Sequence, residues 1–253
     1  MTHDELIQMK KGYIDVHCHV IPHIDDGART TSQALRMIGI AYKNGIRTMV
    51  ATPHYEVSRY DNNIEKIIKY YNKVKMLAKE KYPDFNIFLG NEVFYSYGVI
   101  DGLNEKRIFT LGETDYVLVE FSPNDSLEHI EKSLYELING GYRPILAHVE
   151  RYENVIKNHR NTERLVEMGV YIQTNVSTLA GKSGHRIRGK VLKLIKRDLI
   201  HFIGTDAHSD GRRAPEAEKG LEYVLKKTDE ETAYRLFRDN ALKMLNNEYL
   251  EED

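Results

Sequence analysis

A repeated order of helix, glycine and strand limits what this chain can fold into. Residues 31–43 have a helical pattern capped by Thr31 or Ser32, which ends at Asn44 and Gly45 before a strand at residues 48–54. The order returns in residues 134–139, followed by two glycines and a strand at 144–149. Glycine suits the left-handed backbone that ends a helix. Strands separated by helices are typical of a parallel sheet, so we expect an α/β fold.

The number of strand candidates narrows this fold class. Seven segments have the apolar pattern of strands, namely residues 13–19, 48–54, 87–94, 116–121, 144–149, 170–175 and 199–206. Helical patterns separate nearly all of them, which favours a TIM-like barrel over the alternative of a doubly wound open sheet. We expect one domain over residues 1–253, with an N-terminal extension at 1–12 that forms a surface helix and a frayed acidic tail at 248–253.

Charge and apolar patterning exclude several classes of protein. The chain has 36 Lys and Arg against 38 Asp and Glu, and its net charge of -2 gives no global basic field. A nucleic-acid partner is therefore not expected. No apolar run approaches the length of a membrane span or of a signal peptide, so we expect a cytoplasmic protein that is not embedded in a membrane.

Cys18 is the only cysteine, which excludes an intrachain disulfide and a zinc ribbon. Cysteine-dependent tyrosine phosphatases place an arginine six residues after the nucleophile, where this chain has Ile24. Strand alternation turns Cys18 away from its histidine neighbours, so we expect it in the core.

Metal-binding side chains stand at or just after the ends of the strand candidates. Because the carboxyl ends of parallel strands form the active site of a barrel, we expect these side chains to converge. A single His-x-His pair would more often be an ordinary polar strand end; the repetition favours a site. The candidate metal ligands are His17, His19, Asp26, His54, Glu92, Glu120, His148, Asp206 and His208.

The chemistry of these residues points to several divalent ions. Glu92 and Glu120 each interrupt an apolar strand, where a carboxylate needs either a Lys or Arg partner or a cation. One first-row metal takes four to six ligands, so nine nitrogen and oxygen donors suit two or three ions that share a bridging carboxylate. Manganese, iron and zinc all fit these donors.

Two arginines near the candidate ligands suggest a phosphate site. Arg151 follows His148 by three residues, and Arg212 follows His208 by four. Guanidinium groups beside cations bind phosphate oxygens well. The alternative for Arg151 is a surface salt bridge to Glu150 or Glu153, and for Arg213 we favour such a surface pairing.

The motifs DVHCHVIPHIDDG, GNEVFY, LVEFS, AHVERY and TDAHSDGR resemble the polymerase and histidinol phosphatase (PHP) superfamily. More narrowly, they are similar to manganese-dependent bacterial tyrosine phosphatases encoded with capsular and exopolysaccharide genes. The resemblance implies a distorted (β/α)7 barrel with three divalent ions, Mn²⁺ first. It places His17, His19, Glu92 and Asp206 on one metal. Glu92, Glu120 and His148 hold the second, and Asp26, His54 and His208 hold the third.

The resemblance also implies an activity. A hydroxide held between two metals would attack phosphotyrosine, Arg151 would bind the phosphate, and Arg212 would assist it. The implied substrate is the phosphorylated tail of a bacterial tyrosine kinase. The proton donor for the leaving group stays open, with His23 or a metal-bound water as candidates. Two alternatives stay open: a phosphatase for a small molecule such as histidinol phosphate, and a metal-binding regulator without turnover. In the histidinol phosphatase branch, histidine more often stands at Asp26 and Glu120.

Four aromatic side chains near the expected rim could either stack on a substrate or pack the barrel. They are Tyr55, Phe94, Tyr95 and Tyr97.

Overall fold

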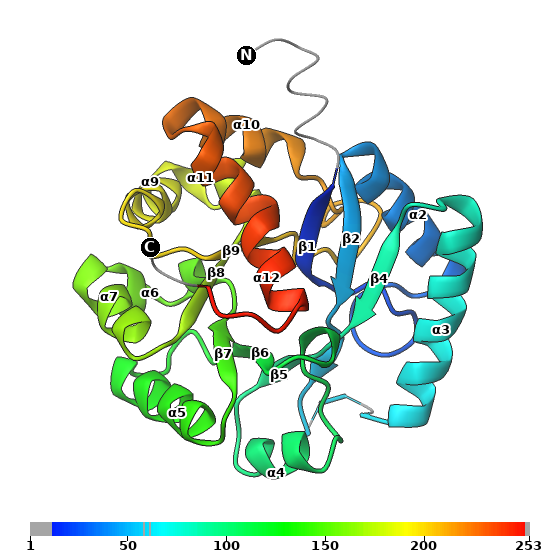
Figure 1. The fold of residues 1–253 in the computed structure, drawn as a ribbon, viewed down its shortest axis with the longest axis horizontal. Coiled ribbons are helices and arrows are strands. Elements are labelled where there is room, and N and C mark those ends of the chain that lie inside the picture. The colour runs from blue at the N-terminus through cyan, green and yellow to red at the C-terminus, as the bar shows by residue number, and fades with distance from the viewer. Residues whose placement is uncertain (1–11, 58, 61, 251–253) are drawn as a thin grey trace.

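A curled parallel sheet surrounded by helices forms the body of the protein (Figure 1). The computed structural model describes residues 12–57, 59, 60 and 62–250. The strands are ordered β1-β2-β4 in one part of the sheet and β3-β5-β6-β7-β8-β9 in the other. Their bounds are β1 Tyr13–Cys18, β2 Ile46–Ala51, β3 His54–Tyr55, β4 Asn86–Leu89, β5 Glu92–Phe94, β6 Tyr116–Glu120, β7 Arg143–Leu146, β8 Tyr171–Asn175 and β9 Phe202–Gly204.

The first strand and the segment after the last strand contact each other. The backbone N–H of Asp206 donates to the carbonyl of His17 at 2.8 Å, and that of His19 donates to the carbonyl of Ala207 at 2.8 Å. A parallel bridge joins Cys18 to Ala207. This contact does not fit an open doubly wound sheet. The predicted α/β fold with a parallel sheet is confirmed, and the sheet curls as in TIM-like barrels.

Two of the predicted strands are each broken into two short strands. Residues 48–54 divide between β2 and β3 because Pro53 has no N–H for the ladder. Residues 87–94 divide between β4 and β5 at Asn91, whose side chain donates to the carbonyl of Pro53 at 2.8 Å. After the breaks, His54 of β3 pairs in register with Glu92 of β5. The interruptions therefore bring two candidate ligands side by side.

Helices cover the outside of the sheet. Residues 31–43 are helical as predicted, but the cap is Thr30, whose hydroxyl accepts from the N–H of Gln33 at 3.1 Å. Gly45 has φ 86°, the left-handed conformation expected after this helix. The α-helices are α2 Thr31–Lys43, α3 Ile64–Lys81, α4 Val99–Asn104, α5 Leu127–Asn139, α6 Glu153–Ile156, α7 His159–Glu167, α8 Val176–Leu179, α9 Gly184–Ile195, α10 Glu218–Lys227, α11 Glu230–Tyr234 and α12 Asn240–Leu245. The described residues also form two 3₁₀ turns, η1 Leu111–Glu113 and η2 Val149–Arg151, and a π-helical turn, η3 Arg235–Asp239.

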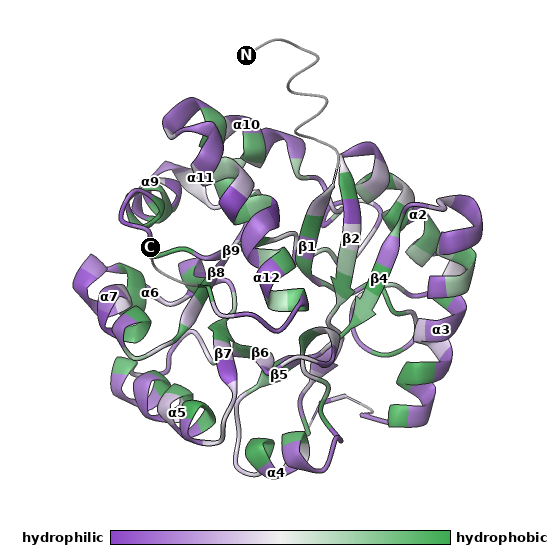
Figure 2. Cartoon of the chain, in the orientation of Figure 1, coloured by the Kyte–Doolittle hydropathy of each residue, from purple (hydrophilic) through white to green (hydrophobic). Residues whose placement is uncertain are grey.

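The helices are amphipathic, and their apolar faces pack on the sheet (Figure 2). In α5 the side chains of Ile130, Leu134 and Leu137 are buried at a spacing of four and three residues. Burying each such side chain contributes roughly 1.5–3 kcal/mol relative to exposure. None of the helices in the described part of the chain is long and apolar enough to cross a membrane.

The C-terminal segment packs at the amino ends of β6 and β7. The hydroxyl of Tyr116 donates to the carbonyl of Glu248 at 2.6 Å, and the Arg143 guanidinium lies 3.6 Å from the ring centroid of Tyr249. Leu250 packs against the core. The prediction of a frayed tail is therefore wrong for residues 248–250. Residues 251–253 and the surface helix expected within residues 1–12 lie outside the described residues, except Gly12.

Candidate metal centre

The nine candidate ligands stand at the carboxyl side of the curled sheet. His17 belongs to β1, His54 and Glu92 begin β3 and β5, and Glu120 ends β6. The others lie in the loops that follow β1, β7 and β9. Their donor atoms form three groups whose members lie within 4.8 Å of one another: His17, His19, Glu92 and Asp206; His54, Glu92 and Glu120; and His19, Asp26, His54 and His208.

The first group has an arrangement suited to one ion. Nε2 of His17 and Nε2 of His19 each lie 3.1 Å from Oε2 of Glu92 and 3.6 Å from Oδ1 of Asp206. Four donors therefore face a common point, as tetrahedral or octahedral coordination requires. This is the set that the resemblance implies for one metal.

The other two groups share His54. Its Nδ1 lies 3.2 Å from Oε2 of Glu92 and 3.1 Å from Oε1 of Glu120, while its Nε2 lies 3.5 Å from Oδ1 of Asp26. Nε2 of His208 lies 3.4 Å from the same Asp26 oxygen. His148, which the resemblance assigns to the second metal, has Nε2 at 2.6 Å from Oε1 of Glu92. The division of His54 and His148 between ions stays a prediction.

Most histidines of the cluster direct Nε2 toward the other candidate ligand atoms. Their Nδ1 atoms face oxygen atoms that are not among these ligand atoms. Nδ1 of His19 lies 2.7 Å from Oδ2 of Asp25, and Nδ1 of His208 lies 3.0 Å from the carbonyl of Asp206. Nδ1 of His17 lies 3.4 Å from Oε1 of Gln173. A hydrogen bond at Nδ1 fixes the tautomer that leaves the Nε2 lone pair for a metal.

The electrostatics of the cluster require a positive charge. Burial would raise the pKa of Glu92, but attraction to His17 and a hydrogen bond with His148 hold it well below its usual range. Burial would lower the pKa of His148, yet hydrogen bonds with Glu120 and Glu92 raise it to about 9. The cluster therefore favours positive charge beside its carboxylates, which divalent cations would supply on binding.

Two atoms show that the residues fit such cations. Nδ1 of His54 and Oε2 of Glu92 are buried and lack a hydrogen-bond partner among the described residues. Buried polar atoms without partners are costly, and a metal ion would satisfy both. The donor set contains nitrogen and oxygen without sulfur, which suits manganese, iron or zinc.

Two cluster residues have strained backbones. His148 has φ 33° and Asp206 has φ 52°, in the left-handed region that side-chain-bearing residues rarely adopt. Such strain persists where the surrounding structure holds it in place, and it gathers at functional sites. Both residues here lie in loops that direct their side chains into the cluster.

Several residues around the cluster were not predicted. Asp25 accepts from the N–H groups of Gly27 at 2.9 Å and His54 at 3.0 Å besides contacting His19. Gln173 accepts from the N–H of His148 at 2.6 Å, and Asn175 donates to Oδ2 of Asp206 at 2.9 Å. The signal for the last two was available, because their alternate spacing in YIQTN turns both to one face of a strand.

The three arginines near the cluster have different surroundings. Arg151 pairs with Asp206 of the cluster, and its alternative partners are engaged elsewhere: Glu150 accepts from Thr174 and Glu153 from Lys190. The surface salt bridge considered for Arg151 is therefore absent from the described structure.

Arg213 also reaches Asp206, with a guanidinium nitrogen 2.8 Å from Oδ1. The surface pairing expected for Arg213 is therefore wrong. Arg212 is exposed and forms no hydrogen bond or ion pair within the described residues. The physical reason is that the loop after β9 has no regular period, so spacing from His208 does not tell which arginine turns inward.

The aromatic residues and His23 have mixed positions. Tyr55 is buried, and the hydroxyl of Tyr95 donates to Glu136 at 2.5 Å, so both pack the structure. Tyr97 is fully exposed in the loop after β5, while Phe94 is partly buried. His23 is exposed and its ring lies 5.0 Å from that of Tyr70, so its role as a proton donor stays a prediction.

A curled parallel sheet with a carboxylate and histidine cluster at the carboxyl ends of its strands defines the class of metal-dependent hydrolases with TIM-like folds. Residues 13–246 match the family model for capsular polysaccharide synthesis, CpsB/CapC. The chain belongs to this family, which confirms the narrower of the two resemblances.

Relatives of known activity cover nearly the whole chain. The chain is 30% identical to the tyrosine-protein phosphatase CpsB of Streptococcus pneumoniae, over 92% of this chain and 98% of that protein. It is 32% identical to the tyrosine-protein phosphatase YwqE of Bacillus subtilis, over 93% and 92%. A crystal structure from work on these two proteins, described as unique metal-dependent tyrosine phosphatases, is similar with a TM-score of 0.87 and 30% identity, covering 95% of this chain and 97% of that one.

A more distant structure shows the fold alone. The phosphotriesterase homology protein of Escherichia coli has a TM-score of 0.59 at 12% identity, over 91% of this chain and 97% of that one.

Proposed function

We propose that this chain is a metal-dependent protein-tyrosine phosphatase. The observation that carries the proposal is the cluster of nitrogen and oxygen donors around Glu92, with Arg151 and Arg213 both placed on its ligand Asp206. Membership of the CpsB/CapC family and the phosphatase relatives support this activity. Two guanidinium groups beside a cation cluster suit the three outer oxygens of a phosphoryl group.

The cluster holds three divalent ions in this proposal, with Mn²⁺ as the first candidate. His17, His19, Glu92 and Asp206 would hold one ion. Glu92, Glu120 and His148 would hold the second, and Asp26, His54 and His208 would hold the third. When bound, such ions lower the pKa of coordinated water from about 15.7 toward 7 and neutralise phosphate charge.

The chain's own residues orient the reaction. Asp25 fixes the ring of His19, and Gln173 fixes the backbone of His148 and the ring of His17. Arg151 and Arg213 bind the phosphate oxygens. The leaving phenolate has a conjugate acid of pKa about 10, so it needs less proton donation than an alkoxide. His23 is the side chain proposed for that donation.

The nine strands count as seven βα units if β2 with β3 and β4 with β5 are each read as one interrupted strand. This gives a single-domain distorted (β/α)7 barrel of the PHP type. The substrate proposed from the resemblance is the tyrosine-rich tail of a bacterial tyrosine kinase that controls capsular or exopolysaccharide synthesis, and the proposed location is the cytoplasm.

Substrate comparison tests the proposal against its alternatives. The manganese-loaded protein should release phosphate chiefly from a phosphotyrosine peptide, and much less from a phosphoserine peptide or from histidinol phosphate. A preference for histidinol phosphate would replace the proposal with the small-molecule phosphatase. Absence of turnover with metal bound would favour the regulator without activity.

The two neighbouring arginines give a matched pair of variants. Arg213→Ala should lower kcat/KM for the phosphotyrosine peptide by about 10- to 100-fold, since a charge-assisted contact to the phosphate is lost. Arg212→Ala should change it by less than about twofold, because this side chain is exposed and unpaired within the described residues. The opposite order would restore the role first expected for Arg212.

Cys18 is buried in the core as predicted, with its thiol 3.4 Å from the carbonyl of Val50 and its pKa raised well above the usual range by burial. Cys18→Ser should leave kcat within about threefold and cost roughly 1–2 kcal/mol of stability, because the hydroxyl is more costly to bury than the thiol. Steady-state kinetics and thermal unfolding measure both effects. Loss of activity with metals and fold retained would contradict a core role.

A further inference from the structure

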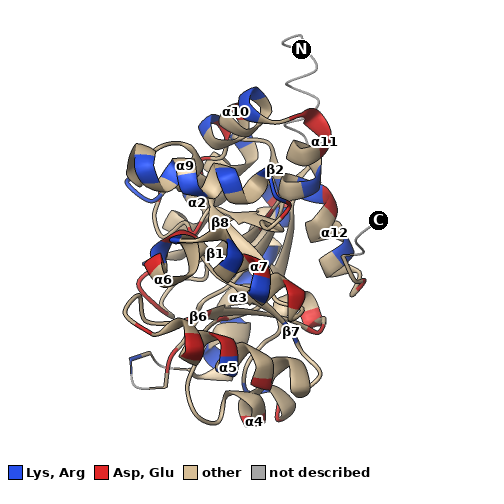
Figure 3. Ribbon diagram, turned by 90° about the vertical axis from the view of Figure 1, so that its left-hand side faces the viewer, with Lys and Arg blue, Asp and Glu red and all other residues tan. Residues whose placement is uncertain are grey.

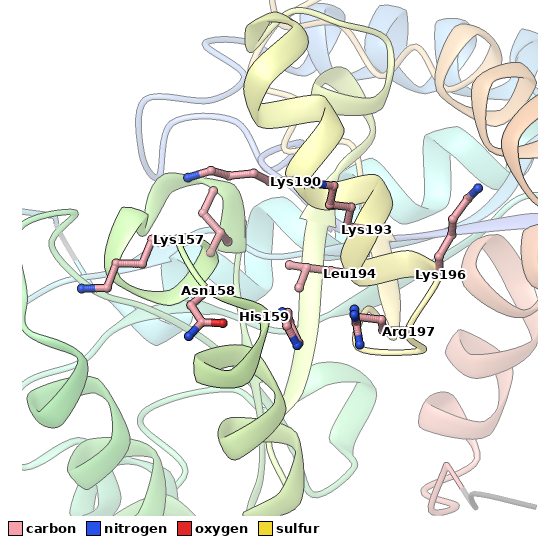
Figure 4. Close-up of a pocket in the computed structure, with 9 residues that line it drawn as sticks. Lys157, Asn158, His159, Lys190, Lys193, Leu194, Lys196 and Arg197 are labelled. Carbon is pink, nitrogen blue, oxygen red and sulfur yellow. The ribbon is translucent and has the colours of Figure 1, made fainter.

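A basic pocket lies on the flank of the barrel between α9 and the segment that joins α6 to α7 (Figure 4). The cavity measures about 740 Å³. Its apolar lining comes from Ile156 and Leu194, which are buried. Its polar lining contains no carboxylate among the described residues; besides Asn158 and His159 it consists of five basic side chains, Lys157, Lys190, Lys193, Lys196 and Arg197. In the close-up, Leu194 lies above the side chains of His159 and Arg197.

The positive charge of this pocket is largely unbalanced. Residues 181–197 contain seven Lys and Arg and no Asp or Glu, although the whole chain has a net charge of -2. Of the cations that line the pocket, only Lys190 forms an ion pair within the described structure, at 2.7 Å from Glu153. Figure 3 shows the resulting concentration of basic residues on α9. A global charge count does not reveal this local field.

Helix α6 connects this pocket along the chain to the turn that carries Arg151. Helix α6 begins two residues after Arg151, and its last residue, Ile156, lines the cavity. The ion pair between Lys190 and Glu153 fastens α9 to the start of α6. Ile156 is five positions after Arg151, so their Cα atoms are at most about 17 Å apart. About five extended residues of a bound peptide would cover that distance.

We propose that this pocket binds an acidic segment of the phosphoprotein substrate, about five residues from the phosphotyrosine being hydrolysed. This inference rests on the proposed phosphatase activity. The anion is a second phosphotyrosine or a run of Asp and Glu. A concave pocket with an apolar floor admits an aromatic or acidic side chain, whereas a flat membrane surface does not enter it. Exposed charge contacts of this kind act mainly on substrate capture and weaken with salt.

The test compares peptides that share one phosphotyrosine and differ in the flank. One flank is neutral, one carries Glu residues about five positions away, and one carries a second, non-hydrolysable phosphotyrosine analogue there. The variant Lys193→Gln/Arg197→Gln removes two pocket charges four residues apart. The control Lys69→Gln/Lys73→Gln removes two exposed charges at the same spacing on α3, on the opposite side of the barrel (Figure 1).

The native protein should prefer the acidic flanks at low salt, and the pocket variant should lose about three- to tenfold in kcat/KM on them, through KM. The neutral peptide and the control variant should be unaffected. Comparison of kcat/KM between the Glu-flanked peptide and the peptide with the phosphotyrosine analogue tells which anion the pocket prefers.

If the native protein hydrolyses all three peptides equally, the pocket does not bind the substrate flank, and the proposed phosphatase activity still stands. If it hydrolyses none of the peptides, the proposed phosphatase activity is wrong. Anionic vesicles or single-stranded DNA that bind through Lys193 and Arg197, with no flank preference, would also contradict a peptide site.

Discussion

Glu92→Ala should reduce phosphotyrosine hydrolysis to background and remove most of the bound metal. Glu92 belongs to two of the three donor groups and lies within 3.2 Å of nitrogen atoms from four histidines: His17, His19, His54 and His148. Truncation deletes the one carboxylate that can bridge two ions, so the charge of the cluster no longer supports both. We expect at least a thousandfold loss in kcat, in the range seen when a catalytic unit is disabled.

The control for this variant is Glu128→Ala, an exposed carboxylate in the first turn of α5. It should keep full metal content and activity. Metal analysis of both proteins, with circular dichroism to check the fold, separates loss of the cluster from unfolding. Near-normal turnover by Glu92→Ala would refute a shared carboxylate at the centre of the site.

Arg151→Ala should retain the metals and lose about 100- to 1,000-fold in kcat. Its guanidinium contacts Asp206, but that ligand also accepts from Asn175 at 2.9 Å and from Arg213 at 2.8 Å. Asp206 therefore stays in place without Arg151, and the loss falls on the phosphoryl group in the transition state.

Arg151→Lys distinguishes charge from shape at the same position. Lysine keeps the positive charge and loses the planar fork that matches two phosphate oxygens, so we expect an intermediate rate. Metal content and kcat measured together decide the role. A variant that loses metal in proportion to its activity would make Arg151 a structural support of the cluster.

The sequence was sufficient to predict the convergence of the ligands because strand ends obey a simple rule. His17 and His19 share a face through alternation, and Glu92 and Glu120 are conspicuous as charges within apolar strands. A parallel curled sheet then brings all strand ends to one side. The α/β class and the ligand neighbourhood follow from local patterns alone.

Features set by loops and tertiary contacts could not be predicted from the pattern of the strands. Arg213 reaches Asp206 instead of Arg212 because an irregular loop sets its direction. Asp25, adjacent to Asp26, has equivalent chemistry, and only the fold shows that it orients His19. The breaks at Pro53 and Asn91 depend on a hydrogen bond between two distant segments. The acidic tail was expected to fray, yet Glu248 contacts Tyr116 across the fold.

The most direct measurement of the central claim is the activity of chelator-stripped protein during stepwise addition of Mn²⁺, with bound metal counted per chain at each step. We expect negligible phosphotyrosine hydrolysis without metal and a rise to full activity as the cluster fills toward three ions. We also expect that Glu92→Ala binds fewer ions and stays inactive at the same free manganese. Full hydrolysis by protein verified to be free of metal would contradict the account.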